Sequence, residues 1–184
     1  MMQILFKDLE LHPVEFDQEF SPEAVRLGDD LRLKAPLRAK GRADMIEENH
    51  GGKKVVRDIW VVGHFDAVLE ADCDRCLDPV ERKIGGDFEV LQRPQAENTG
   101  ADEHEIKQGE TEIGFYEGDS ILLEDVLKEQ VLLAMPAKTL CRENCKGLCP
   151  ECGRNRNKEQ CQCVTEFRDP RWAALGEIRK KLQN

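Results

Sequence analysis

The chain has 184 residues, of which 40% are hydrophobic and 35% are charged, and its formal net charge is −10. This length suits one ordinary domain with an appendage. The negative charge excludes a globally basic nucleic-acid-binding protein, although it allows a local basic patch.

Compartment can be inferred from the apolar stretches and the cysteines. The longest uninterrupted apolar stretch, 131–137, is far shorter than the roughly 20 residues that span a bilayer, so we expect no transmembrane helix and no membrane partner. The first ten residues contain charges and lack the apolar core of a secretion signal. We therefore expect a cytoplasmic protein whose eight cysteines meet a reducing environment, where structural disulfides are rare.

Alternating apolar and polar residues over 31–47 and 55–69 predict two strands with one buried face each. The segment ENHGG between them predicts a turn, so together they predict a long antiparallel hairpin, with a break or edge position at Pro36. Residues 79–91 predict a third strand, bulged or bent at Gly85-Gly86, and residues 2–7 predict a short edge strand. Residues 8–30 show a mixed pattern that assigns no element.

Residues 92–118 are polar and acidic and predict a long loop. We interpret this acidic connector as a solvated excursion, with a nucleic-acid mimic or a partner-binding arm as the alternative. A helix is predicted over 120–135, because Asp119-Ser120 offers an N-cap, apolar residues follow at helical spacing and Pro136 ends the pattern. Asp169-Pro170 predicts the start of a terminal helix.

These elements predict an α+β fold, in which an antiparallel β-sheet made of the long hairpin and the third strand packs against the amphipathic helix. The predicted β-rich core domain covers 1–136. Residues 137–184 form a cysteine-rich, zinc-ribbon-like segment with the terminal helix. Residues 131–184 carry 11 basic and 6 acidic side chains, a net charge of +5, and hold six of the eight cysteines, so their chemistry differs from that of the rest.

Four cysteines near the C-terminus have the spacing of a zinc ribbon. Cys149 and Cys152 flank Pro-Glu and precede Gly153, which is the composition of a tight turn that points two sulfurs at one ion. Cys161 and Cys163 place both sulfurs on one face of an extended chain, because side chains there alternate with a period of two. The spacing predicts that Zn²⁺ is bound by these four thiolates.

The other cysteines form two more pairs, Cys73 with Cys76 and Cys141 with Cys145. Joining these pairs into a second four-thiolate site leaves no sulfur without a partner, and it would connect the end of the hairpin to the segment after the first helix. Redox thiols, an iron–sulfur cluster and inert thiols are the alternatives for the cysteines. A zinc ion with four thiolates has no open position for water, so such sites would be structural.

Motifs of common enzymes are missing from the sequence. It contains no P-loop, no dinucleotide-binding motif after a strand and no nucleophile elbow. Its four histidines are scattered, and His64 falls within a strand pattern, where we expect a hydrogen-bonded sheet residue. We therefore expect a protein that is not an enzyme and has no small-molecule substrate.

The segments that contain the cysteines resemble the YceD family, known as the large ribosomal RNA subunit accumulation proteins. The segments are CDRCLDP (73–79), LCRENCKGLCPECGRN (140–155), CQC (161–163) and DPRWAAL (169–175). The hairpin, the acidic connector and the helix ending at Pro136 fit as well, so the resemblance covers most of residues 55–175. Some family members lack the cysteine-rich tail and keep only the first C-x-x-C, so the tail cannot be the whole function.

The resemblance implies a ribosome biogenesis factor that supports 23S rRNA accumulation or processing and large ribosomal subunit assembly. It implies no established catalytic activity and no agreed RNA-binding residues. Its partner would be precursor rRNA or a large-subunit ribosomal protein. The alternative function is a redox-responsive zinc thiol protein or chaperone that releases zinc when its thiols are oxidised.

Basic side chains of the C-terminal segment are the candidate RNA contacts, because cations hold phosphates and neighbouring aromatic rings can stack on exposed bases. Phe167 and Trp172 are the interleaved aromatics, unless they belong to the core and the basic groups are only solvated. The candidate contacts are Arg154, Arg156, Lys158, Arg168 and Arg171.

Overall fold

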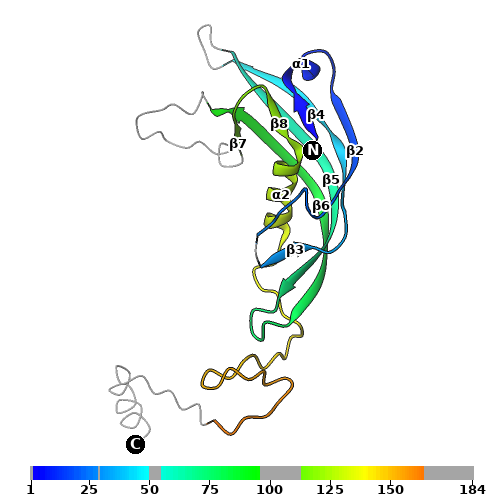
Figure 1. Cartoon of the computed structure of the whole chain (residues 1–184). Coiled ribbons are helices and arrows are strands. Elements are labelled where there is room, and N and C mark those ends of the chain that lie inside the picture. The colour runs from blue at the N-terminus through cyan, green and yellow to red at the C-terminus, as the bar shows by residue number, and fades with distance from the viewer. Residues whose placement is uncertain (1, 29, 50–54, 96–112, 164–184) are drawn as a thin grey trace, which may run out of the picture. The chain divides into compact units, whose positions relative to one another are not determined.

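The computed structural model describes residues 2–28, 30–49, 55–95 and 113–163 (Figure 1). The chain divides into two compact units. The first comprises residues 1–72 and 79–139, and the second comprises residues 73–78 and 140–184. The acidic connector from 96 to 112 and the predicted helix after Asp169 lie outside the described residues. No helix within the described ranges is long and apolar enough to cross a bilayer.

The first unit is built on a six-stranded mixed sheet. Its neighbouring strands run antiparallel, except for the last pair, which is parallel. Along the sheet the order is β2 (Val14–Phe20), β4 (Leu37–Asn49), β5 (Val55–Asp72), β6 (Pro79–Pro94) and β7 (Ile113–Tyr116), and β3 (Leu31–Leu33) also pairs with β5.

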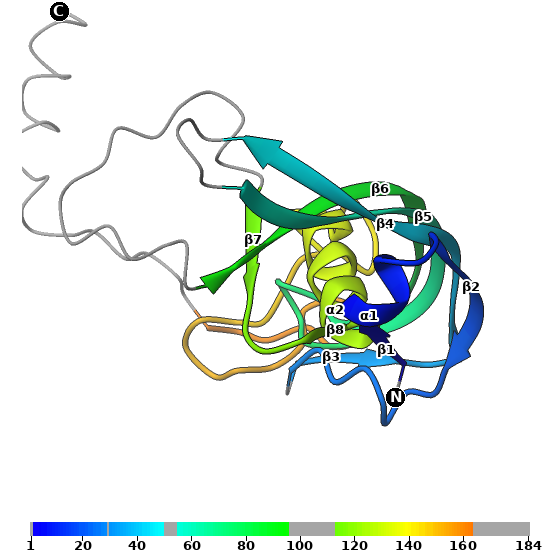
Figure 2. The ribbon, with the colours of Figure 1, turned by 90° about the horizontal axis from the view of Figure 1, so that it is seen from above.

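A second, two-stranded sheet and two helices complete this unit. β1 (Gln3–Leu5) pairs with β8 (Ser120–Leu122) and leads into the short helix α1 (Phe6–Leu9). The longer helix α2 (Leu123–Ala134) directly follows β8. Figure 2 shows the large sheet curving around α2, so that the helix lies on its concave side.

The core lies between α2 and the concave face of the sheet. Helix α2 contributes Leu123, Leu127 and Val131, which are fully buried, because apolar residues recur there at helical spacing. Strand β5 contributes Ile59 and Val61, which are also fully buried. Every residue of the hydrophobic core cluster found in the described part of the chain belongs to this first unit.

One row across four strands explains two glycines in the middle of the sheet. Phe16, Gly41, Gly63 and Phe88 are successive partners on β2, β4, β5 and β6. A Cβ added at Gly41 would collide with the carbonyl oxygen of Val62 and lie 2.7 Å from the ring of Phe16, and one at Gly63 would lie 3.0 Å from the ring of Phe88. The two aromatic rings thus fill the space that the glycines leave on the buried face.

The predicted hairpin and third strand are present as β4, β5 and β6. The first predicted strand is interrupted around Pro36, which separates β3 from β4. Of the two predicted irregularities at Gly85-Gly86, a bulge or a bend, the bulge is wrong, because pairing with β5 continues without an extra residue through Asp66 and Phe65. A Cβ at Gly85 would lie 2.6 Å from the Phe65 carbonyl oxygen, so this glycine permits close approach of the backbones.

Two boundaries also differ from the sequence prediction. Helix α2 begins at Leu123, with Leu122 as an extended N-cap that makes no side-chain capping bond, so the predicted Asp119-Ser120 cap is wrong. Residues 120–122 pair with β1 instead, which buries Ile121 against Ile4. The described end of the acidic connector forms β7, and the segment left without an assignment contains β2.

Candidate metal centre

Two of the second unit's cysteine pairs, Cys73 with Cys76 and Cys149 with Cys152, lie in tight turns of the same kind. In the first, between β5 and β6, the N–H of Leu77 donates to the carbonyl of Cys73 at 2.9 Å. In the second, the N–H of Gly153 donates to the carbonyl of Cys149, also at 2.9 Å. Leu77 and Gly153 both have a positive φ, 58° and 70°. Each C-x-x-C turn therefore ends in a left-handed residue, which leaves backbone N–H groups near the sulfurs.

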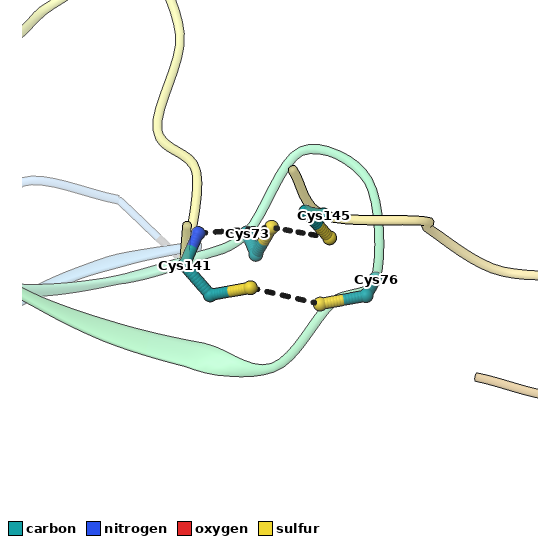
Figure 3. Close-up of side chains that lie close together, drawn as sticks. All are labelled: Cys73, Cys76, Cys141 and Cys145. Carbon is teal, nitrogen blue, oxygen red and sulfur yellow. Dashed lines mark hydrogen bonds between the residues drawn. The ribbon is translucent and has the colours of Figure 1, made fainter. Parts of the chain in front are cut away.

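The first cluster consists of Cys73, Cys76, Cys141 and Cys145. Their sulfurs all lie within 4.8 Å of one another, with 3.9 Å between Cys73 and Cys145 and 3.7 Å between Cys76 and Cys141 (Figure 3). A disulfide requires about 2.05 Å, so these are free thiols. Four sulfurs at about 2.3 Å from a tetrahedral zinc ion are about 3.8 Å apart, so the two closest pairs already have the spacing of a zinc site.

The second cluster consists of Cys149, Cys152, Cys161 and Cys163, whose sulfurs also lie within 4.8 Å of one another. Cys149 is buried, whereas Cys152 and Cys163 are exposed. The structure thus brings together both sets of four cysteines that the sequence grouped. The second set is the more accessible to solvent.

Hydrogen bonds and burial shift the pKa values of two thiols in the first cluster in opposite directions. Burial acts to raise the pKa of Cys73, but backbone N–H groups, including that of Cys141, outweigh it and lower the pKa to about 6. The Cys141 N–H lies 3.3 Å from the Cys73 sulfur. The N–H of Asp78 acts to lower the pKa of Cys76, but burial and the neighbouring sulfurs raise it to about 12. Several thiolates can coexist here only beside a cation.

The second cluster shows the same contrast. Backbone N–H groups of Cys152 and Glu151 lower the pKa of Cys149 to about 6, against the effect of burial. The sulfur of Cys152, burial and the sulfur of Cys149 raise the pKa of Cys163 to about 12. The donor set of both clusters suits a thiophilic divalent cation such as zinc.

A network of polar side chains, which was not predicted from the sequence, hydrogen-bonds to the first cluster and to the turn that contains Cys73 and Cys76. The Asn157 amide donates to the Cys145 sulfur at 3.2 Å and to the Asn155 side-chain oxygen at 2.9 Å. Asn155 donates to Asp78 at 3.0 Å, and Lys158 forms an ion pair with Asp78 at 2.7 Å. Asn155, Asn157 and Lys158 lie in the loop between Cys152 and Cys161 of the second cluster. The loop of the second cluster therefore also contacts residues of the first.

The candidate RNA contacts divide into three groups. Arg154 and Arg156 are exposed. Lys158 is also exposed, but its ammonium group is held by Asp78, so part of its charge is already used. Arg168 and Arg171, with the aromatic residues beside them, lie outside the described residues.

His64 is a hydrogen-bonded residue of β5, 2.7 Å from the Asp87 carboxylate.

Fold and clusters together define a class of protein: a mixed β-sheet unit joined to a cysteine-rich unit with two groups of four sulfurs that could each hold a metal ion. The chain belongs to the YceD family, because the family model described as large ribosomal RNA subunit accumulation protein YceD matches residues 61–179. The resemblance seen in the sequence is thereby confirmed.

Relatives with similar sequences extend this result. An uncharacterised protein of Mycobacterium tuberculosis is 31% identical over 68% of this chain, and the match spans 58% of that protein's length. The uncharacterised protein YlbN of Bacillus subtilis is 28% identical over 91% of this chain and 88% of its own. The large ribosomal RNA subunit accumulation protein YCED homolog 1, chloroplastic, of Arabidopsis thaliana is 35% identical over 31% of this chain and 18% of its own. No solved structure matches the chain.

Proposed function

We propose that the chain is a non-enzymatic, zinc-binding ribosome biogenesis factor of the cytoplasm, which supports 23S rRNA accumulation or processing and large-subunit assembly. The observation that carries this proposal is the match of the YceD family model over 61–179, because that family is named for accumulation of the large ribosomal RNA. The name of the plant relative supports it.

Zinc would be held by all eight cysteines, four in each cluster. The sulfur separations of 3.7 and 3.9 Å in the first cluster support this, because they are close to the tetrahedral value. Bound zinc would supply a cross-link and no reactive position, since four thiolates fill its coordination sphere. Amide donors from Asn157 and from the backbone of Cys141 would orient the thiolates.

The proposed partner is precursor rRNA or a large-subunit ribosomal protein. Arg154 and Arg156 support an RNA contact, because both are exposed on the cysteine-rich unit and their charge is opposite to that of the whole chain. We expect such a contact to be weak and sensitive to salt, because the net charge of −10 repels phosphate elsewhere.

The function can be tested in a strain depleted of this protein by measuring the ratio of mature 23S to 16S rRNA and the amount of free large subunit. Wild-type protein should restore 23S rRNA. A chain carrying Cys73→Ser and Cys76→Ser should restore it poorly, whereas the variant Gln18→Ala, at an exposed position of β2, should act as wild type. Normal 23S rRNA levels after complete depletion would remove the proposal.

A second candidate function is a redox-responsive zinc thiol protein. The exposed sulfurs of Cys152 and Cys163 favour it, because accessible thiolates are oxidised first. Mild peroxide should then release zinc from the second cluster before the first, followed with a chromogenic zinc chelator. If 23S rRNA accumulation is unchanged by peroxide while zinc is released, oxidation is damage and not regulation.

A further inference from the structure

A groove of about 570 Å³ opens on the first unit, and none of its lining residues is a cysteine. It is lined by β7, by β8 and by the first turns of α2. Its apolar lining includes Phe115, which is 45% exposed, and the buried side chains of Ile121 and Val126. Most of the accessible lining is polar, so the groove suits a polar ligand that makes an apolar contact with the exposed ring of Phe115.

Three carboxylates surround this groove: Glu117, Asp125 and Glu129. All three are exposed, and within the described residues none of them forms an ion pair. Asp125 and Glu129 lie four residues apart on α2, an arrangement of like charges that destabilises an isolated helix. Asp125 is also favoured by its place in the first turn of the helix. Together the three carboxylates give the groove a negative charge that would attract a cationic ligand.

A buried amide supplies an independent indication of a ligand. Gln92 of β6 is only 6% exposed and lines the groove, yet its side chain has no hydrogen-bond partner among the described residues. Its partner in the sheet is Gly114, where an added Cβ would collide with the Gln92 amide nitrogen. The glycine thus makes room for an amide that makes no hydrogen bond within the described protein and reaches the groove, where it can donate to or accept from a ligand.

Two strand edges adjoin the same groove. β7 is the last strand of the six-stranded sheet, and β8 has β1 as its one described neighbour. Each therefore presents backbone N–H and C=O groups that an added extended chain could pair with. Nucleic acid would place phosphates beside three carboxylates, so the charge of the groove disfavours it.

We propose that the groove between β7, β8 and α2 binds an extended, lysine- or arginine-rich peptide segment of a partner protein. Cationic side chains of the peptide pair with Glu117, Asp125 and Glu129, its apolar side chains contact Phe115, and its backbone or a polar side chain hydrogen-bonds Gln92. This proposal rests on the proposed function only for the origin of the peptide, since it selects a basic protein over RNA as the partner at this site.

The test uses the full chain and a fluorescein-labelled peptide of alternating lysine and valine, with binding followed by fluorescence anisotropy. The groove variant Glu117→Gln, Asp125→Asn, Glu129→Gln should bind about tenfold more weakly, because it removes three exposed charge pairs that are each weak. Gln92→Leu should also weaken binding, with no change in net charge.

A control variant with the same change in charge separates specific from general attraction. Glu15→Gln, Glu23→Gln, Asp30→Asn neutralises three exposed carboxylates that lie outside the groove lining and, like those of the groove, form no ion pair among the described residues. It should bind the peptide about as well as wild type. Equal loss of affinity in both triple variants, or tighter binding of a single-stranded RNA oligonucleotide than of the peptide at the groove, overturns the proposal.

Failure of this inference is distinguishable from failure of the proposed function. Loss of 23S rRNA on depletion, with peptide binding unaffected by the groove variant, overturns the groove and retains the biogenesis role. Normal 23S rRNA levels after depletion, with peptide binding that is weakened by the groove variant, overturn the biogenesis role and retain the groove. Chemical shifts of the labelled chain should move at 114–117 and 120–129 on peptide addition, and shifts confined to other segments would also overturn the groove.

Discussion

Asn157 is the residue of the loop between Cys152 and Cys161 that contacts a sulfur of the first cluster directly. Its amide nitrogen donates to the Cys145 sulfur, and its oxygen accepts from the N–H of Lys146 at 2.8 Å and from Arg142 at 2.7 Å. A side chain with this many fixed bonds holds both the sulfur and the backbone that follows it. Asn157 therefore positions a proposed metal ligand without being one.

Asn157→Asp should weaken zinc binding at the first cluster by about 10- to 100-fold, the usual effect of losing such a partner. The variant keeps the oxygen that accepts from Lys146, but it replaces the donor to Cys145 with a negative charge. Competition with a chelator of known affinity measures the effect. Glu159→Gln in the same loop is the control, and equal zinc affinities of the two variants would show that the Asn157 bond is incidental.

Leu77 and Gly153 occupy equivalent positions, so they form a matched pair. A left-handed conformation costs a residue with a Cβ roughly 1 kcal/mol, a cost that Leu77 bears and Gly153 avoids. Gly153→Ala should therefore lower the stability of the cysteine-rich unit by about 1 kcal/mol, while Leu77→Gly should not lower it. Thermal unfolding of the zinc-loaded protein compares them, and the opposite order would mean that the Leu77 side chain stabilises its turn.

Cysteine spacing was sufficient to predict the clusters, because C-x-x-C turns are local structures. The partnership of Cys73 and Cys76 with Cys141 and Cys145 followed from counting sulfurs, although these pairs are about 65 residues apart. Asn155, Asn157 and Asp78 could not be found this way. Their roles depend on which loop folds back on which, and an Asn-x-Asn segment has no periodicity that indicates a contact with sulfur.

At the scale of elements, the strongest constraint on the sheet is the central glycine pair. Gly41→Ala should destabilise the first unit by about 1–3 kcal/mol, because the new methyl group collides with the Val62 carbonyl and with Phe16. Gly86→Ala is the matched control, since a Cβ there has no atom within 4 Å. Urea unfolding measures both variants, and equal stabilities would mean that the sheet shifts freely at this row.

The long strands were predictable because one face of each is buried, which imposes strict alternation. The short edge strand predicted at residues 2–7 is present as β1, but the short strands β7 and β8 were not predicted. β7 has four residues and β8 has three, and both were read as loop or helix because their pairing partners, β6 and β1, lie far away in sequence. The Asp119-Ser120 cap failed for the same reason: pairing of residues 120–122 with β1 outweighs a local capping preference.

At the scale of the whole molecule, the two units are stabilised by different means. The hydrophobic core cluster of the described residues lies entirely in the first unit. In the described part of the second unit, the buried apolar side chains are all cysteines: Cys73, Cys76, Cys145 and Cys149. A segment with so little apolar burial needs another source of folding free energy, and metal binding supplies it in small cysteine-rich units.

Chelation of zinc should therefore unfold the second unit and leave the first folded. Amide signals of residues 140–163 should collapse to unfolded positions in the NMR spectrum of the full chain, while those of β4, β5 and β6 persist. Far-ultraviolet circular dichroism should change little, because the sheet lies in the first unit. Adding zinc back under reducing conditions should restore the spectrum.

The loop 73–78 makes this prediction sharper, because β5 and β6 belong to the first unit while the loop between them belongs to the second. Pairing of β5 with β6 extends to Asp72 and Pro79, so the strand ends are fixed by the sheet. Signals of Cys73 to Asp78 should therefore broaden on chelation while those of Ala71 and Val80, the next pair in from the strand ends, stay in place. If the strand signals also disappear, the clusters stabilise the sheet and the units fold as one. If the loop and residues 140–163 remain ordered without metal, their fold depends on the Asp78, Asn155 and Asn157 network rather than on zinc.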